Sequence, residues 1–291
     1  MKRTLIVTSL LLVGACSTPA PSAPPAAPAN ATPPAPALIE IPRAGDQPVS
    51  ALEKKPVTVA ADLDAIAERG HLRILVAPSR THFETVNGSH HGRTVDAGVA
   101  VAAQLSKQYG RTIVPVFIAT KEDRLIPDLL AGKGDVAANV LLTFARDEQV
   151  AFAPPVRSNI RELIVSGTRI ISLEDIGERT IHVRKNGDHH ISLIRLNEQL
   201  KKIDRPGAKI VADDKVQTDE DLLDQVNYGR IPATIVDDYI LDVWQAKLPK
   251  VSVNRDVAVS QDGSISWVSR KDAPKLIAFL KEFFSTHQLT F

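Results

Sequence analysis

Few side chains in this sequence have the types and spacing that chemistry requires. Histidines form two adjacent pairs, at residues 90–91 and 189–190, and a further histidine stands at position 82. Imidazoles brought together from two such loops could close around a transition metal or an acidic ligand. Alternatively, both loops carry exposed histidines, with one ring of each pair pointing away. We take His82 and His189 as candidates for binding a ligand.

The sequence contains few residue patterns typical of an enzyme active site. Acidic residues adjoin at 213–214 and 237–238, but neighbours in an extended segment point to opposite sides, which suits caps and turns better than a carboxylate dyad. The only cysteine is Cys16, and neither a G-x-S-x-G elbow nor a phosphate-binding glycine loop occurs. We therefore expect a protein that is not an enzyme, with no catalytic residues, no cofactor and no metal.

Charge and composition exclude further classes of function. The 291 residues carry 35 Lys and Arg against 34 Asp and Glu, and aromatic residues make up 4%. A protein that tracks phosphates normally has a basic excess, and one that binds single strands needs aromatic platforms for stacking. No nucleic-acid partner is therefore expected. One cysteine also cannot build a disulfide framework or a Cys-based zinc cluster.

The first residues predict an export signal. Lys2 and Arg3 precede an apolar run of about nine residues, far short of the ~20 that span a bilayer as a helix, and small residues follow. Val13 to Cys16 (VGAC) resembles the lipobox of bacterial lipoproteins, which implies a signal peptide over residues 1–15 and acylation of Cys16. Ser17 resembles the outer-membrane sorting pattern. The implied location is the periplasmic side of the cell envelope, lipid-anchored at the outer membrane; the alternative is an ordinary signal peptide with an incidental cysteine.

Residues 16–57 predict a disordered tether that begins at the acylated cysteine. They hold eleven of the chain's 20 prolines among Ala, Ser and Thr, a composition that buries too little apolar surface to offset the entropy of ordering. Proline-rich linkers favour extended polyproline II at about 3.1 Å per residue, so roughly 40 residues reach on the order of 100 Å. We expect a spacer between a membrane surface and a folded module.

From residue 58 onward, β-rich runs alternate with amphipathic helices. This alternation predicts an α/β fold with parallel sheets, helices on both faces and ligand chemistry at the strand carboxyl ends. The pattern restarts after residue 157, which predicts two lobes, residues 58–157 plus 261–291 and residues 158–260. The expected strands are 72–77, 112–118 (an edge or bulge because of Pro115), 135–142, 161–166, 180–184, 209–212, 233–236, 251–259 and 264–268. The expected helices or helical turns are 95–109, 124–131, 144–149, 173–176, 191–203, 219–228, 239–246 and 273–285.

Four short motifs stand in a fixed order within this folded part. They are LDAIAERGHLRI at 63–74, TFAR at 143–146 followed by VAFAPP at 150–155, SLEDI at 172–176 and GRIPATIVD at 229–237. In this order and spacing they resemble the family 3 extracytoplasmic solute-binding proteins, and within that family the N-terminal, non-catalytic module of the membrane-bound lytic transglycosylases F. The resemblance covers residues 63–284. It implies the periplasmic binding protein type II fold, two α/β lobes with a ligand cleft between them.

The resemblance also implies a ligand, an amino acid or similar small polar solute, and residues that hold it. Arg146 is the candidate for the ligand carboxylate, because a guanidinium fork donates two parallel hydrogen bonds. Thr143 would add a hydroxyl or a backbone N–H. Asp237 is the candidate for the ammonium group, and Phe83 falls where an aromatic ring would lie over the ligand.

Each candidate has a structural alternative. Arg146 could form a surface salt bridge on its short helix, and Phe83 could belong to the core. Asp237 could cap the helix that follows it, and Asp238 competes for either role. The chain also departs from the family pattern at Leu141, where many members have Ser or Thr, at Thr94 and Asp96, which stand for the family's acidic pair, and at Asp188, which would repel a ligand carboxylate from a helix start.

Two functions follow from the resemblance. The first is an envelope lipoprotein that closes its lobes around an amino acid-like solute, for ABC-type uptake or sensing. The alternative is a regulatory or degenerate module that recognises cell-wall fragments or a partner protein without a catalytic domain of its own. The expected partners are an amino acid, short peptide or muropeptide, an ABC permease or cell-wall enzyme, and the membrane through the lipid anchor. A wall-cleaving enzyme would carry a further helical domain, for which we expect no room after residue 285.

Overall fold

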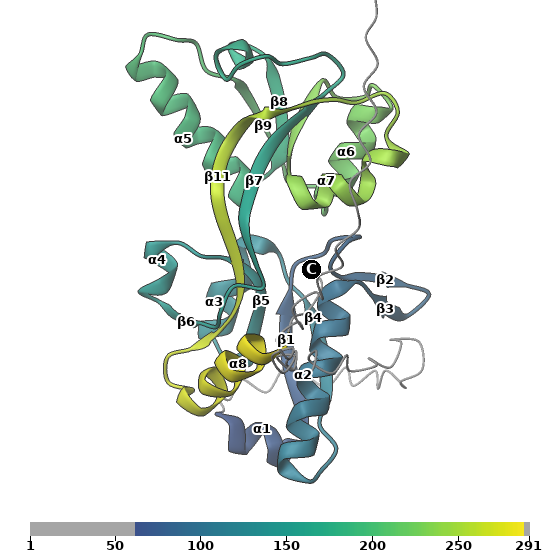
Figure 1. Ribbon diagram of the computed structural model, residues 1–291, viewed down its shortest axis with the longest axis vertical. Helices are drawn as coiled ribbons and strands as arrows, with labels where there is room; N and C mark the ends of the chain where they lie inside the picture. Colours follow the sequence, from purple (N-terminus) through teal and green to yellow (C-terminus); the bar gives the residue numbers. More distant parts are fainter. Residues whose placement is uncertain (1–61, 288–291) are drawn as a thin grey trace, which may run out of the picture. The chain divides into compact units, whose positions relative to one another are not determined.

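The fold comes from a computed structural model that describes residues 62–287 (Figure 1). The expected signal peptide, the acylated Cys16 and the proline-rich tether lie outside the described residues. Within 62–287, no helix combines the length and the apolar character that crossing a membrane requires.

The described residues build a mixed nine-stranded sheet with the strand order β4-β1-β5-β11-β7-β10-β8-β9 and with β6 paired to β11. Strands pair in parallel toward the two ends of this order, β4-β1-β5 at one and β10-β8-β9 at the other. In the middle, β7 and β11 are antiparallel to each other and to the strands beside them. The strand bounds are β1 (His71–Val76), β4 (Val114–Ala119), β5 (Val136–Leu141), β6 (Val150–Phe152), β7 (Arg157–Ser166), β8 (Thr180–Arg184), β9 (Lys209–Asp213), β10 (Ala233–Asp237) and β11 (Ser252–Arg270).

We call the elements from α1 to β6, together with α8, lobe 1, and those from η3 to η4 lobe 2; β7 and β11 run side by side from one to the other (Figure 1). Lobe 1 contains α1 (Leu63–Arg69), β2 (Glu84–Val86), β3 (Ser89–His91), α2 (Arg93–Tyr109), η2 (Glu122–Arg124), α3 (Leu125–Leu130), α4 (Phe144–Asp147) and α8 (Pro274–Thr286). Lobe 2 contains η3 (Glu174–Ile176), α5 (Asp188–Lys202), α6 (Asp219–Asn227), α7 (Asp238–Trp244) and η4 (Gln245–Lys247). The expected lobe boundaries, after residues 157 and 260, fall within β7 and β11 and stay a prediction.

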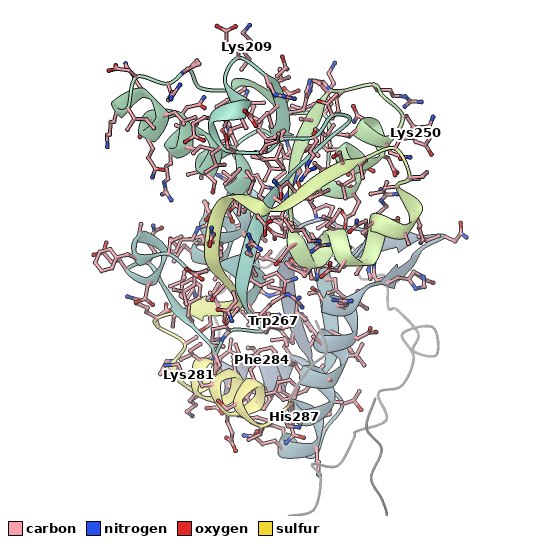
Figure 2. The ribbon with its side chains drawn as sticks, turned by 45° about the horizontal axis from the view of Figure 1, so that its top comes forward. Lys209, Lys250, Trp267, Lys281, Phe284 and His287 are labelled. Carbon is pink, nitrogen blue, oxygen red and sulfur yellow. The ribbon has the colours of Figure 1, made fainter. Side chains whose placement is uncertain are left out.

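Helices cover both faces of the sheet in each lobe, as the alternating pattern predicted. Successive strand residues point to opposite faces, and Ile74 and Leu75 of β1 accordingly enter different apolar clusters, one with α2 and α8 and the other with α3. Trp267 is fully buried in the first cluster, and its ring centroid lies 5.4 Å from that of Phe284 (Figure 2). In lobe 2, Ile164 and Val165 of β7 separate in the same way, toward α5 and toward α6 and α7.

The purely parallel arrangement expected from the sequence is wrong for the centre of the sheet. Segments 251–259 and 264–268 were expected as separate strands, but they form the single strand β11. The turn-forming residues between them cause the difference: Asp262 adopts a positive φ of 60°, and the pairing of β11 with β7 shifts register on either side of Gly263. Such residues can form a bulge that bends a strand without ending it.

The loop expected to carry the first histidine pair is a β-hairpin. Strands β2 and β3 pair around Asn87 and Gly88, which have φ values of 51° and 79°. An Asn-Gly pair with both residues at positive φ is the usual two-residue hairpin turn. The hairpin meets α2 at Gly92, where φ is 119° and an added Cβ would lie 2.4 Å from the carbonyl oxygen of His82. Only glycine fits this approach.

Helix α5 starts earlier than the apolar pattern indicated. The expected start was Ile191, the first apolar residue, whereas the helix begins at Asp188 after Gly187. A helix start is often polar because its free N–H groups favour polar partners. Asp188 and His189 therefore belong to the first turn of α5.

Candidate functional site

The site residues follow the carboxyl ends of parallel strands, the place where α/β sheets carry ligand chemistry. Glu122 follows β4, Arg146 follows β5, Arg184 ends β8 and Asp237 ends β10. Two of these four strands belong to each lobe, so the groups meet where the lobes face one another.

The guanidinium of Arg146 holds a carboxylate of lobe 2. Its Nη1 donates to Oδ2 of Asp188 at 3.1 Å and its Nη2 donates to Oδ1 at 2.5 Å, while Nη1 also donates to the carbonyl of Leu141 at 3.1 Å. The side chains of Arg146 and Asp188 are only 21% and 20% exposed. Two parallel N–H···O bonds are the geometry of bidentate carboxylate recognition. The salt bridge considered as an alternative thus exists, but it joins the two lobes and is largely buried.

The short helix α4 positions Arg146. Thr143 caps this helix, with its hydroxyl oxygen accepting the backbone N–H of Arg146 at 3.3 Å. Capping of this kind satisfies a helix N–H that has no partner within the helix. The Thr143 side chain therefore holds the turn that carries the guanidinium.

Asp188 occupies the place where the sequence led us to expect repulsion of a ligand carboxylate. Its backbone N–H donates to Oε1 of Glu122 at 2.9 Å, so an anion of lobe 1 already sits at the start of α5. Burial, then the negative charge of Glu122, raises the pKa of Asp188 to about 6, although Arg146 acts in the opposite direction. Arg146 is thus the group that favours the ionised form of Asp188.

Glu122 and Arg184 form a second ion pair between the lobes. Nη2 of Arg184 lies 2.5 Å from Oε2 of Glu122, and the same guanidinium donates to both oxygens of Asp219 at 2.7 and 2.9 Å. Burial alone would raise the pKa of Glu122, but the charge of Arg184, the hydrogen bond from the Asp188 backbone N–H and the charge of His189 together hold that pKa below its ordinary value. Sequence reasoning missed these three residues; the one available signal was that Arg184 is a charged residue at a strand end.

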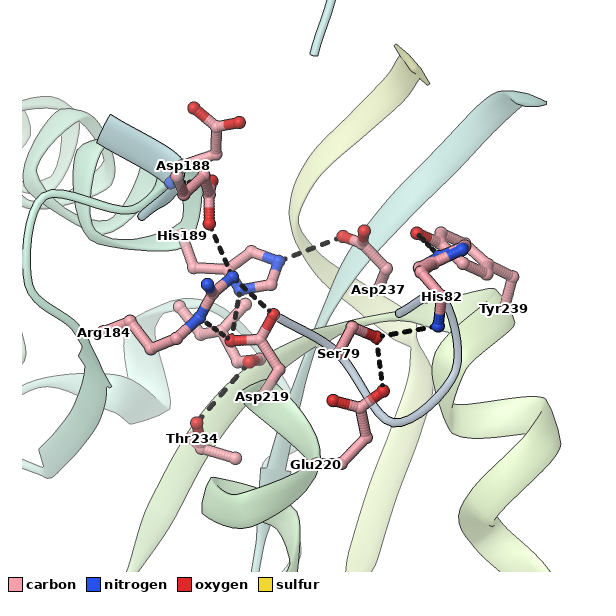
Figure 3. Close-up of polar contacts among 12 residues, drawn as sticks. Ser79, His82, Arg184, Asp188, His189, Asp219, Glu220, Thr234, Asp237 and Tyr239 are labelled. Carbon is pink, nitrogen blue, oxygen red and sulfur yellow. Dashed lines mark hydrogen bonds and ion pairs between the residues drawn. The ribbon is translucent and has the colours of Figure 1, made fainter. Parts of the chain in front are cut away.

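His189 lies between two carboxylates (Figure 3). Its Nε2 is 3.0 Å from Oδ1 of Asp237, and its Nδ1 is 3.6 Å from Oδ1 of Asp219. Burial opposes protonation, but the two carboxylates dominate and raise the pKa of His189 well above its ordinary value. The ring is therefore an imidazolium at neutral pH, and it is the cation that Asp237 holds in this structure.

A further carboxyl group stands close to this cation. Glu162 of β7 accepts a hydrogen bond from the Ser192 hydroxyl at 3.0 Å. Burial raises the pKa of Glu162 to about 7, even though the charge of His189 lowers it. Glu162 therefore titrates close to neutral pH, as does Asp188 beside it.

The two adjacent acids at the end of β10 have separate roles. Asp237 makes no side-chain capping bond to α7 and faces His189. Asp238 instead accepts the backbone N–H of Tyr239 at 2.9 Å and that of Arg161 at 3.4 Å. Asp238 thus makes the capping contact and Asp237 faces His189, while the role of Asp237 toward a ligand stays a prediction.

The remaining candidates, His82 and Phe83, lie in lobe 1. His82 is 5% exposed, and its Nε2 is 3.0 Å from the hydroxyl of Tyr239 in lobe 2. Burial lowers the pKa of His82 to about 4, so the ring is neutral. Phe83 is 3% exposed and packs with Val76 and Val95 in a small core cluster.

Two cavities adjoin these groups. One of about 180 Å³ is lined by residues that include Glu122, Asn139, Arg146 and Asp188. The other, of about 640 Å³, is lined from lobe 1 by residues 78–80, residues 83–85 and Ala119, and from lobe 2 by the loop before α6 and α6 itself. Both have charged and amide side chains in their walls, which suits polar ligands.

The structure links the candidates through two consecutive residues. Arg146, the candidate for binding a ligand carboxylate, contacts Asp188. Asp237, the candidate for binding a ligand ammonium group, contacts His189, the next residue of α5. Of the other members of the histidine pairs, His90 packs its ring on Phe83, and Nδ1 of His190 accepts the backbone N–H of Asn186 at 3.1 Å. Over the range 62–287, no group of three or more His, Cys, Asp or Glu side chains is arranged to hold a metal ion.

The sequence is similar to one protein family and to several known proteins. The profile described as "Bacterial extracellular solute-binding proteins, family 3" matches residues 72–288. A membrane-bound lytic murein transglycosylase F of Salmonella paratyphi B is 27% identical over 226 residues, which cover 76% of this chain and 42% of that protein. A transglycosylase F of Saccharophagus degradans is 29% identical over 140 residues, covering 47% of this chain and 26% of the relative. The chain thus spans well under half the length of these relatives.

Solved structures agree on the fold. The arginine-bound form of a truncated ArgBP from T. maritima has a TM-score of 0.59 and 22% identity, covering 76% of this chain and 98% of the other. An amino acid ABC transporter substrate-binding protein from Streptococcus pneumoniae, bound to L-arginine, has a TM-score of 0.61 and 18% identity, covering 77% and 90%. The expected periplasmic binding protein type II fold, two α/β lobes joined by the central strands, is confirmed.

Proposed function

Because the chain belongs to the family 3 bacterial extracellular solute-binding proteins, we propose that it binds a small amino acid-like solute between its two lobes. One observation carries the proposal: Arg146 presents a bidentate fork to the opposite lobe and holds a carboxylate there. A solute carboxylate would take the same two hydrogen bonds. Asp237 contacts His189, the residue that follows Asp188 on α5, and would accept the solute's ammonium group in its place.

Solute binding would favour the arrangement in which the lobes meet. Arg146 belongs to lobe 1 and Asp237 to lobe 2, so a solute that contacts both gains affinity only when the lobes are close. A ligand shifts a conformational equilibrium by its difference in affinity for the two states. Two similar solved structures are bound to arginine, and one of them is an amino acid ABC transporter substrate-binding protein, which supports an amino acid-like solute and a role in ABC-type uptake or sensing.

We place this activity in the bacterial envelope. The apolar run and the VGAC sequence at Cys16 support a lipoprotein whose proline-rich tether holds the binding lobes away from the periplasmic face of a membrane. The test is a Cys16→Ser variant in cells fed a labelled fatty acid. The variant should incorporate no label and should no longer be found in the membrane fraction. A variant that stays in the membrane fraction would remove the lipid anchor from the proposal.

A second function is favoured by the curated relatives. Transglycosylases F match 76% of this chain, and the chain spans 42% of such a relative. A regulatory module that recognises cell-wall fragments, or that contacts a cell-wall enzyme, would use the same cleft, because wall peptides carry the carboxylate and ammonium groups of amino acids. The two functions differ in ligand size, and that difference can be measured.

The test is titration calorimetry of the purified protein with amino acids, short peptides and muropeptides. Arg146→Ala should abolish the binding of any ligand that titrates, because a buried carboxylate without its guanidinium partner is strongly disfavoured. Arg195→Ala, an exposed arginine on α5 away from the site, is the matched control and should leave binding unchanged. Preference for muropeptides over amino acids would select the second function, and binding that survives Arg146→Ala would exclude the proposed site.

A further inference from the structure

We propose that Asp188 and His189 occupy the solute site as a built-in ligand, so that a solute binds by displacing them. The proposal rests on the proposed function and deepens it. It makes these two residues the determinants of which solutes the site accepts, namely those that can replace both contacts.

The first argument is the pattern of charge. An amino acid presents an anion and a cation a few ångströms apart. Asp188 and His189 present the same two charges on consecutive residues, the carboxylate to Arg146 and the imidazolium to Asp237. These are the two groups that the family resemblance assigned to the carboxylate and the ammonium of a ligand. The first turn of α5 thus supplies both charges of a zwitterion, each to its matching partner.

The second argument is burial. The side chains of His189 and Asp237 are 10% and 18% exposed, and the pair of Arg146 and Asp188 is nearly as well covered. Removing one partner of a buried ion pair leaves the other charge without compensation, which is strongly unfavourable. Arg146 and Asp237 therefore need partners when the lobes are together. Asp188 and His189 are those partners in this structure.

The third argument is that the contacts join the lobes. Arg146 and Glu122 reach Asp188 from lobe 1, Glu122 also pairs with Arg184, and Nδ2 of Asn186 donates to Oδ2 of Asp123 at 3.2 Å. These bonds hold the start of α5 against lobe 1. Contacts within the chain therefore bridge the lobes at the place where the proposed solute would bridge them.

A tethered carboxylate is a strong competitor. Because Asp188 is part of the chain, its effective concentration at Arg146 is far higher than that of a free solute. Removal of Asp188 should therefore free Arg146 and strengthen solute binding by roughly tenfold or more. The same removal should weaken the contact between the lobes.

Asp188→Ala with formate as probe tests the proposal. Formate has the size and charge of the carboxylate that this substitution deletes, so it should refill the fork of Arg146. We expect formate to raise the melting temperature of Asp188→Ala by several degrees more than chloride at equal ionic strength. It should have no such effect on the wild type, on the double variant Arg146→Ala/Asp188→Ala, or on Asp147→Ala, which removes an exposed aspartate of α4.

Solute binding is measured on the same proteins with L-alanine and L-arginine, and Asp188→Asn covers the case in which Asp188→Ala does not fold. The amide fills the space but cannot neutralise Arg146, so affinity should rise while formate has no effect. Absence of a formate effect on Asp188→Ala, or a solute that binds the wild type and binds Asp188→Asn no more tightly, overturns the built-in ligand. If formate stabilises Asp188→Ala but no variant binds any solute, the built-in ligand stands and the proposed function fails. If wild type and variants bind equally well, the function stands and the built-in ligand fails.

Discussion

The carboxylate of Glu220, at the start of α6, accepts hydrogen bonds from both the backbone N–H and the hydroxyl of Thr81, at 2.9 and 2.7 Å. Thr81 lies in the loop after β1, so this contact joins lobe 2 to lobe 1. The Ser79 hydroxyl donates to the same oxygen at 2.8 Å, and the Trp244 indole donates to the Thr81 hydroxyl at 2.9 Å. The lobes are therefore joined at this loop as well as at Arg146.

Glu220→Ala should lower the free energy of unfolding by about 3 kcal/mol, because it leaves buried donors of the Thr81 loop without an acceptor. Urea denaturation followed by circular dichroism measures the change. Glu198→Ala, at an exposed position of α5, is the control and should change stability by less than about 0.5 kcal/mol. Equal effects of the two substitutions would show that the Glu220 contacts contribute nothing net.

Glu162 should make stability depend on pH. Its pKa is raised to about 7 in the folded protein, so the folded state binds more protons than the unfolded state between about pH 4.5 and 7. The contribution of this group is present at low pH and is lost as the pH rises through that window. A Glu162→Gln variant stays neutral, so its stability relative to wild type should grow by roughly 3 kcal/mol from pH 4.5 to 7 and then level off. Denaturant titrations at several pH values measure this difference, and Glu282→Gln on the exposed face of α8 should show none.

Thr143 should act through the cap that holds Arg146. Thr143→Ala should cost about 1 kcal/mol of stability and weaken solute binding, whereas Thr143→Ser keeps the hydroxyl acceptor and should restore both. Thermal melts and calorimetry on the two variants check this. A loss of binding in Thr143→Ala with no loss of stability would instead point to direct contact between Thr143 and the solute.

Gly92→Ala should be among the most damaging single substitutions in lobe 1. The new Cβ would lie 2.4 Å from the carbonyl oxygen of His82, at a φ of 119° that side chains rarely adopt, and we expect a loss of about 3 kcal/mol or more. Gly110→Ala is the matched control, since its φ is also positive, at 64°, but its Cβ would meet nothing within 4 Å. It should cost about 1 kcal/mol. Equal losses in the two variants would mean that the close approach to His82 is relieved at no cost.

Local patterns in the sequence predicted most of the fold. Apolar periodicity placed the strands and helices, and Pro115 correctly indicated an edge, since β4 ends the sheet. The errors have a common cause, because they occur where turn residues serve another purpose. Asp262 and Gly263 bend β11 without ending it, and Asn87 and Gly88 form a hairpin turn that an Asn-Gly search would have found.

The site could be predicted only in part. The motifs pointed to Arg146 and Asp237, but nothing local shows that Asp188 would reach Arg146, which is 42 residues away in the sequence. The network of Glu122, Arg184 and Asp219 has the same character, because its members come from three separate segments. Asp188 was expected to repel a ligand carboxylate, and in the structure its own carboxylate binds the guanidinium of Arg146. Ion pairs between lobes depend on how the segments pack, and spacing along one segment does not reveal them.

The continuous strands β7 and β11 determine how this protein can open. Both connections between the lobes belong to one hydrogen-bonded ladder, so the lobes can separate only by flexing both strands together. The pairing of these strands shifts register at four places between Val253 and Ile265. Amide exchange along this stretch should therefore report opening of the lobes, whichever ligand, internal or external, holds them together.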